Sequence, residues 1–266
     1  MIRLLNSFLL LFVLVCACGD SEDPPVLATG AAPDLSCLGV RSAPMGGETT
    51  LVTRPVVPFG APPTVTIPGV PVRFFLGDRV TATCELPDCI MTLSDDTGMA
   101  SAELPAGAWV VTEVPEIPGP DAARSLMRTI ESQWIAGDEE TINTFSRGTL
   151  ADFESVLGFA VDPARGIVSG RILDCQDRPL ENVEVRWFDD DREIAGDSIY
   201  FNGALPPALD IERDRSASDG RYAGILPPEV SRVEAWGVVD GETVRIACED
   251  VQVEPDSLSV LVLKPT

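Results

Sequence analysis

The sequence has no histidine and one lysine, Lys264, so several catalytic designs lack the residues that they require. Without histidine there is no histidine-based triad and no histidine metal site. A serine–lysine pair would need Lys264, which falls in a predicted C-terminal strand. No G-x-S-x-G segment and no phosphate-binding glycine loop occurs either. These absences predict a protein that is not an enzyme and holds no cofactor.

Basic residues are also scarce. The chain has 19 Lys+Arg against 42 Asp+Glu, which gives a formal net charge of −23. Nucleic acid and anionic lipid surfaces repel such a chain, so we expect no nucleic-acid partner. Hydrophobic residues make up 45% of the 266 residues, which is enough for a buried core and excludes wholesale disorder. The length allows one or two domains.

An apolar run over residues 4–15 follows the basic start at Arg3. It is too short to span a bilayer, for which roughly 20 residues are needed, but it has the length of a signal-peptide hydrophobic region. The run ends in VCACG at residues 15–19, which resembles the lipobox of bacterial lipoproteins. That resemblance implies a signal peptide over residues 1–17 and acyl chains such as palmitate on Cys18. The alternative is an ordinary signal peptide in which Cys18 is incidental.

The lipobox resemblance also implies a place in the bacterial cell envelope, with the membrane as partner through the lipid anchor. In the proteobacterial lipoproteins that the motif resembles, an Asp after the lipidated cysteine retains the protein in the inner membrane. Gly19 stands at that position here, which favours the outer membrane. Residues 18–44 are acidic, rich in proline and without periodicity, which predicts a flexible tether.

Export to an oxidising compartment favours disulfides among the remaining cysteines. Cys84 and Cys89 flank a tight turn and are predicted to form a local bridge. Cys175 and Cys248 lie in two strand-like runs, so we expect them to pair. Cys37 is then free, paired between molecules, or in competition for Cys84. A zinc site at Cys84 and Cys89 would lack two further ligands, so no metal site is expected there.

Short alternating stretches separated by turn signals predict a β-sandwich unit over residues 45–118 and another over residues 161–266. Between them, residues 119–160 show helical spacing, with one helix that starts at Asp121 and stops at Gly137 and a second capped by Thr149. The predicted fold class is therefore mainly β. Two immunoglobulin-like or transthyretin-like β-sandwich units are joined by a short helical segment and follow a lipoprotein signal peptide.

The two β regions resemble each other. VPVRFF at residues 70–75 matches VEVRWF at residues 183–188. Downstream, the turn and strand at residues 96–105 match those at residues 219–227, and both end in Leu-Pro. Each unit thus contains a strand, an excursion, a turn with Asp and Gly, and a second strand, which indicates a tandem repeat.

The second unit carries a more specific pattern. It reads GIVSGRILD at residues 166–174, RPLENVEV at 178–185, SDGRY at 218–222, and a Leu-Pro turn at 226–227. This pattern resembles the carboxypeptidase regulatory-like domain, a transthyretin-like β-sandwich. The family's signatures specify turns and core positions, and its modules are usually accessory spacers or binding modules. The resemblance therefore implies a non-enzymatic structural or protein-interaction module.

The polar insertion at residues 189–216 holds the candidate binding residues. Tyr200 and Phe201 are predicted to be exposed platforms for a glycan, and the alternative function is therefore a carbohydrate-binding lipoprotein. Acids that could hold Ca²⁺ through their oxygens are Asp189, Asp190 and Asp191. Solvated loop acids are the favoured interpretation of that cluster. The expected partner is an unknown envelope protein or a glycan.

Overall fold

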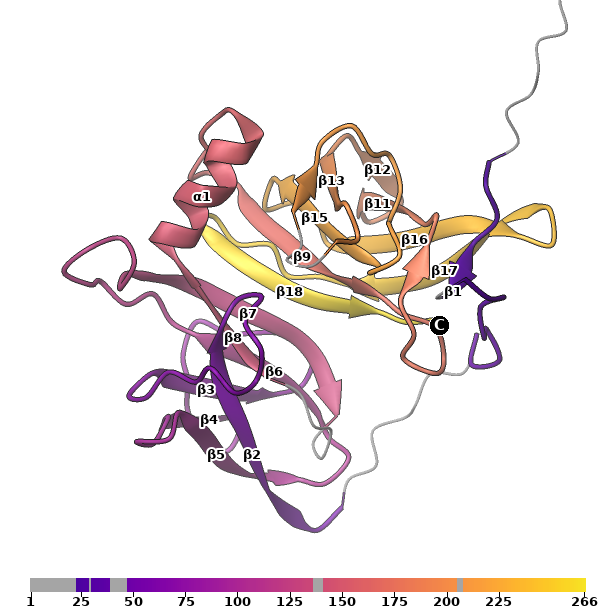
Figure 1. Cartoon of the computed structure of the whole chain (residues 1–266). Helices are drawn as coiled ribbons and strands as arrows, with labels where there is room; N and C mark the ends of the chain where they lie inside the picture. Colours follow the sequence, from indigo (N-terminus) through magenta and orange to yellow (C-terminus); the bar gives the residue numbers. More distant parts are fainter. Residues whose placement is uncertain (1–22, 29, 39–46, 136–140, 205–207) are drawn as a thin grey trace, which may run out of the picture.

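The computed structural model describes residues 23–28, 30–38, 47–135, 141–204 and 208–266. The predicted signal peptide (residues 1–17) and the lipidated Cys18 lie outside these residues. The chain is mainly β, and its strands form two β-sandwich modules that Figure 1 shows side by side. Module 1 spans residues 47–146, and module 2 spans residues 166–266.

Module 1 is a sandwich of two sheet layers. Its strands are β2 (Thr49–Pro58), β3 (Pro71–Leu76), β4 (Cys89–Leu93), β5 (Met99–Pro105), β6 (Trp109–Val114), β7 (Leu126–Ile135) and β8 (Ile142–Ser146). One layer has the order β4-β3-β6-β7, and the other has β5-β2-β8. Apolar side chains that alternate along the strands meet between the layers, where Val56, Phe74 and Ile142 are fully buried.

Module 2 is a second, larger sandwich. Its strands are β9 (Gly166–Ile172), β10 (Leu180–Glu181), β11 (Glu184–Asp189), β12 (Arg192–Ile194), β13 (Asp197–Phe201), β14 (Leu209–Asp210), β15 (Arg221–Leu226), β16 (Arg232–Val239), β17 (Glu242–Asp250) and β18 (Ser257–Leu263). One layer has the order β12-β11-β16-β17, and the other has β14-β13-β15-β9-β18. Trp187 and Tyr222 pack between these layers, with ring centroids 6.1 Å apart.

The strand pairing shows that the two modules repeat one design. In module 1, β2 pairs antiparallel with β5 and parallel with β8, while β3 and β6 continue the other layer toward β7. In module 2, β9 pairs antiparallel with β15 and parallel with β18, while β11 and β16 continue toward β17. Gly98 and Gly220, which precede β5 and β15, both have positive φ. The tandem repeat indicated by the sequence is therefore present in the pairing.

The helix predicted from Asp121 is wrong, because residues 126–135 form strand β7. Met127 and Ile130 point to opposite faces of this strand, yet both are buried. Met127 packs with Phe145 and Leu258, whereas Ile130 belongs to a different cluster of module 1. A strand buried on both faces loses the alternation that identifies strands, and its apolar residues fell by chance at helical spacing.

The second predicted helix is present as α1 (Arg147–Leu157), the one helix within the described ranges. Its N-cap is Ser146, whose hydroxyl accepts a hydrogen bond from the Thr149 N–H at 3.0 Å, so Thr149 is not the cap. Gly158, at φ 78°, ends the helix in the left-handed region.

A parallel pairing between β7 and β18 joins the modules. It runs from Ser257↔Arg128 to Val260↔Glu131. Both layers of module 1 and the β14-β13-β15-β9-β18 layer of module 2 are thereby part of one 12-stranded sheet. Helix α1 covers one end of that sheet's outer face, where Phe153 packs against apolar residues of both β18 and β15. Figure 1 shows α1 beside the ends of β9 and β18. The modules are therefore joined by a shared sheet as well as by the chain segment that contains α1, and residues 126–135 of the predicted helical linker are part of that sheet.

Residues 23–38, here called the N-terminal strap, pack on module 2. β1 (Leu27–Ala28) pairs with β10, and Val26 and Ala28 are buried in the core of module 2. Asp23 forms an ion pair with Arg215 at 2.7 Å. The flexible tether predicted over residues 18–44 is wrong for this described part, because the apolar side chains of the strap complete the sandwich core.

The disulfides differ in part from the predicted ones. Cys84 and Cys89 are bridged, which confirms the local pair. The predicted Cys175–Cys248 bridge is wrong: Cys175 pairs with Cys37 of the strap, and Cys248 is free. The cause is the strap itself, which brings Cys37 alongside Cys175 so that the Cys37 N–H lies 2.9 Å from the Cys175 sulfur.

We predict that Cys37→Ser or Cys175→Ser lowers the free energy of unfolding by about 2–5 kcal/mol, since their bridge closes a long loop. Cys248→Ser is the matched control and should change it by less than about 0.5 kcal/mol. Urea unfolding without reductant measures all three variants. Recovery of a peptide that links Cys175 to Cys248 from the non-reduced protein would contradict the assignment.

Candidate functional site

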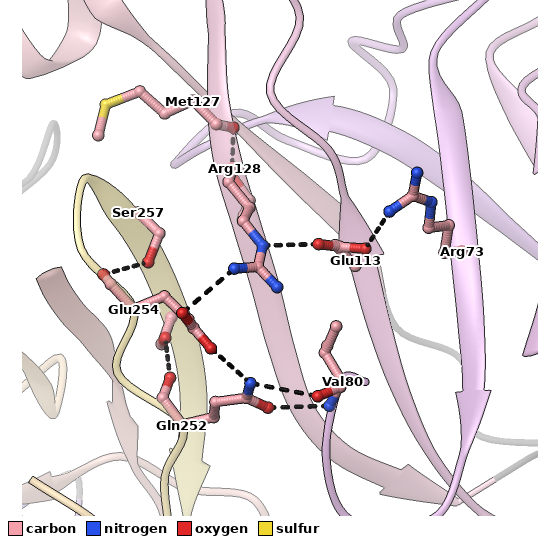
Figure 2. Close-up of polar contacts among 10 residues, drawn as sticks. Arg73, Val80, Glu113, Met127, Arg128, Gln252, Glu254 and Ser257 are labelled. Atoms are coloured by element: carbon pink, nitrogen blue, oxygen red, sulfur yellow. Dashed lines mark hydrogen bonds and ion pairs between the residues drawn. The ribbon is translucent and has the colours of Figure 1, made fainter. Parts of the chain in front are cut away.

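A buried carboxylate lies at the centre of the junction between the modules. Glu113 on β6 is 3% exposed and accepts hydrogen bonds from Arg73 at 3.0 Å and from Arg128 at 2.6 Å. These arginines come from β3 and β7, the two strands that flank β6 (Figure 2). An unpaired charge at such a position is costly, and the two arginines provide the opposite charge beside Glu113 inside the sheet.

Module 2 contains the same device at the equivalent place. Arg73 lies opposite Glu113 in module 1, and Arg186 lies opposite Glu234 in module 2. Glu234 is buried, with Arg245 at 3.1 Å and Arg232 at 3.4 Å from its Oε1. The repeated arginine in VRFF and VRWF is therefore part of a structural ion pair in module 1 and faces the equivalent glutamate in module 2.

In module 1 the device extends across the junction. The Arg128 guanidinium also lies 3.4 Å from the Glu254 carboxylate of module 2. Glu254 accepts a hydrogen bond from Gln252 at 2.8 Å, and the Gln252 amide accepts from the N–H of Val80 at 2.8 Å and donates to its C=O at 3.3 Å. Figure 2 shows this chain of contacts from Arg73 to Val80. It ties the β3–β4 loop, β7 and the segment before β18 together.

A second ion pair crosses the junction beside α1. Arg147, the first residue of α1, holds the Asp256 carboxylate through both terminal nitrogens and also reaches Glu116 at 3.1 Å. The hydrogen bonds to Asp256 raise the pKa of Arg147 above its usual value, although partial burial opposes the charge. The charge of Arg147 is therefore favoured by its position between the two carboxylates.

A cleft of about 470 Å³ opens along the same junction. One wall is the loop after β2, with Phe59 and Pro63, and the floor comes from β7, β9 and β18. Ser169 and Val260 lie in this floor. A pocket of this size, between two domains and with mixed polar and apolar walls, has the dimensions of a small-ligand site.

The predicted glycan platform is wrong for Tyr200. Its side chain is 1% exposed in the core of module 2, and its hydroxyl oxygen accepts a hydrogen bond from the Val185 N–H at 2.8 Å. Burial raises the pKa of Tyr200 to about 12. Phe201, the next residue, points to the other face of β13, is half-buried, and lines the cleft. Because side chains alternate along β13, Tyr200 lies in the core and Phe201 lies at the cleft.

The three acids considered for Ca²⁺ lie at the turn between β11 and β12. Asp189 forms an ion pair with Arg192 at 2.8 Å, and Asp191 forms one with Arg232 at 3.5 Å. Asp190 occupies the turn with φ 51°. In the ranges that the structure covers, no group of three or more Cys, Asp or Glu side chains could hold a metal ion. The arginine pairing agrees with the interpretation of these acids as solvated turn residues.

Sequence reasoning missed Glu113, Arg128 and Glu254, and it missed the cleft. The arginine that recurs in VRFF and VRWF could have pointed to Glu113, because a charged residue repeated within an apolar strand is unusual. No helix of the described residues is long and apolar enough to span a membrane.

No family model matches this chain, and no curated protein matches it. Among solved structures, it is similar to the shaft pilin of Lactobacillus rhamnosus GG, with 12% identity over 82% of this chain and 98% of that one and a TM-score of 0.24. The minor pilin of Streptococcus agalactiae shows 10% identity over 81% and 96%, with a TM-score of 0.22. For the TIE protein of Bacillus anthracis, the match spans 34% of that chain, at 10% identity and a TM-score of 0.24. These proteins are β-rich like this one, and at such scores the likeness supports no statement about function.

We predict that Glu113→Ala lowers the free energy of unfolding by about 2–3 kcal/mol, because it leaves Arg73 and Arg128 without their shared carboxylate. Both arginines are partly exposed, which keeps the loss at the lower end for such pairs. Asp78→Ala is the matched control, since its pair with Arg79 is 63% and 73% exposed and should contribute at most about 1 kcal/mol. Equal losses in the two variants, measured by urea unfolding, would refute a structural role for Glu113.

Proposed function

We propose that this chain is a non-enzymatic lipoprotein of the bacterial cell envelope whose two modules form one rigid arm for contact with another envelope protein. The observation that carries the proposal is the junction. Paired strands β7 and β18 cross it, and the ion pairs of Arg128 and Arg147 reinforce it on both sides. Domains that share a sheet do not move against each other as domains on a flexible linker do.

The N-terminal strap gives this arm an orientation. A lipid on Cys18 would be separated from Asp23, where the strap meets module 2, by roughly 18 Å of fully extended chain. Because the strap is buried in module 2 and bridged through Cys37, module 2 would lie next to the membrane. Module 1 would then be presented away from it. The outer membrane, which Gly19 favours, is the proposed location.

Module 2 is further proposed to be a carboxypeptidase regulatory-like sandwich. Two observations support this proposal: residues 166–174 form β9 and the turn after it, and Asp219 and Gly220 form the turn into β15. Asp174 is fully buried and accepts hydrogen bonds from the N–H groups of Gln176 and Arg178. The accessory role that this resemblance implies is consistent with a rigid arm. It is less consistent with a catalytic domain.

The contact surface of the arm is proposed to be β4 of module 1. In the described ranges β4 pairs with β3 alone, so its other edge is open. Met91 and Leu93 alternate on this strand and are 65% and 63% exposed. An open edge that carries exposed apolar side chains is a typical site of protein–protein pairing, and soluble proteins otherwise avoid it.

We expect metabolic palmitate labelling of the protein in its native cell, and loss of the label in Cys18→Ala. Cys16→Ala, which changes the other cysteine of the motif, should keep the label. An unlabelled wild-type protein, or a label that persists in Cys18→Ala, would rule out the anchor.

A photoreactive amino acid in place of Met91 should give an ultraviolet-dependent protein adduct in the cell, because β4 faces the partner. The same residue in place of Glu242, in the β16–β17 hairpin close to the strap, should give none. Adducts read on a denaturing gel check both positions. Equal labelling from both sites, or none from Met91, would overturn β4 as the contact surface.

A further inference from the structure

Two arginines lie directly opposite each other on the outer face of module 2. Arg171 on β9 pairs in register with Arg221 on β15. Their strand neighbours Ile172 and Tyr222 point into the core, so both guanidinium groups point away from it. Like charges opposite each other on one sheet face are destabilising. Such an arrangement is unexpected in a chain with 42 acidic residues available.

The protein itself neutralises this pair incompletely. The Asp219 carboxylate lies 3.7 Å from the Arg221 guanidinium, and the Asp219 carbonyl oxygen lies 3.4 Å from Arg171. No carboxylate in the described part of the chain forms an ion pair with Arg171. Partial burial lowers the pKa of Arg221, with Arg171 acting in the same direction and Asp219 against it. Arg221 is therefore paired with one carboxylate at a loose distance, and Arg171 is paired with none among the described residues.

Both arginines line the cleft between the modules. Half-buried aromatic rings, Phe59 of module 1 and Phe201 of module 2, contribute to the same lining. Glu131 also lines it, two strands across and two residues along from Arg171, which is roughly 12 Å between backbones. That carboxylate accepts hydrogen bonds from the N–H and the side-chain amide of Asn143 at 2.7 and 2.6 Å. The cationic end and the Glu131 end of the cleft are thus separate.

We propose that this cleft binds an acidic sugar of the uronic-acid type, whose carboxylate is held by Arg171 and Arg221 and whose ring packs against Phe59 and Phe201. Guanidinium groups bind planar carboxylates in a bidentate manner, and apolar walls with few polar groups are typical of small-ligand sites. This site does not depend on the proposed role as an arm.

The floor of the cleft favours a sugar over a peptide. A peptide strand binds by pairing its backbone with an open sheet edge. Here the floor strands β9 and β18 are paired on both sides, so their backbone groups are already used. What the cleft offers instead are side-chain hydroxyl and amide groups, including those of Thr141 and Asn143, which suit a ligand rich in hydroxyl groups.

The test uses the chain without its signal peptide and lipid, and trigalacturonic acid as the probe. Isothermal titration calorimetry should detect binding, and Arg171→Gln or Arg221→Gln should each weaken it at least tenfold. Arg192→Gln removes the same charge from an exposed pair outside the cleft and should leave the affinity unchanged. The methyl-esterified trimer, which has the same shape without the charge, should also bind at least tenfold more weakly.

A second measurement separates lost binding from lost folding. Because the arginines repel each other, Arg171→Gln should leave the melting temperature equal to or above that of the wild type. No binding of trigalacturonic acid by the wild type at millimolar concentration would overturn the proposal. So would equal binding of the esterified trimer, equal affinity in the Arg171→Gln and Arg192→Gln variants, or tighter binding of triglutamate, which would indicate an acidic peptide ligand.

Discussion

The parallel pairing of β7 with β18 is the contact on which the rest of the architecture depends. Each module alone would leave one side of these strands without hydrogen-bond partners, and their pairing removes both open edges at once. It also fixes the position of α1, which covers the outer face where the sheets merge. The cleft exists for the same reason, since its floor is the merged sheet and its wall belongs to module 1. If β7 separated from β18, the fixed arrangement of the two modules and the cleft between them would both be lost.

Both modules contain a buried glutamate paired with an arginine of a neighbouring strand, and in module 1 this arrangement also contributes to the junction. Glu113 and Glu234 are both buried on the central strand of their layers, and both are approached by arginines of neighbouring strands. In module 2, Arg245 on β17 is half exposed, because β17 is the edge of its layer. In module 1, the strand at that place is β7, and its Arg128 meets Glu254 of the other module. Arg128 therefore pairs with a carboxylate inside module 1 and with a carboxylate of module 2 at the same time.

The sequence predicts local features of this protein well and long-range ones poorly. The mainly β composition, the repeat and the Cys84–Cys89 bridge depend on nearby residues, and all three are present in the structure. β7 was misjudged because its burial on both faces results from β18, more than a hundred residues away. Tyr200 looked accessible because a polar insertion surrounds it in sequence, whereas β13 continues the sheet and turns this side chain into the core. No local pattern contains that information.

The N-terminal strap is the strongest case of a long-range effect. The described chain runs from the strap on module 2 to module 1 and back to module 2, and Cys37–Cys175 links the strap to module 2 across 138 residues. A force applied to module 1 is therefore transmitted to the strap in two ways. One is through the paired strands of the junction, and the other is through the covalent loop. Without the bridge, the strap would be held by the two-residue β1 pairing, by the burial of Val26 and Ala28, and by polar contacts such as the Asp23–Arg215 ion pair. Short strands of this kind are marginal alone, so the disulfide is what makes the attachment to module 2 permanent.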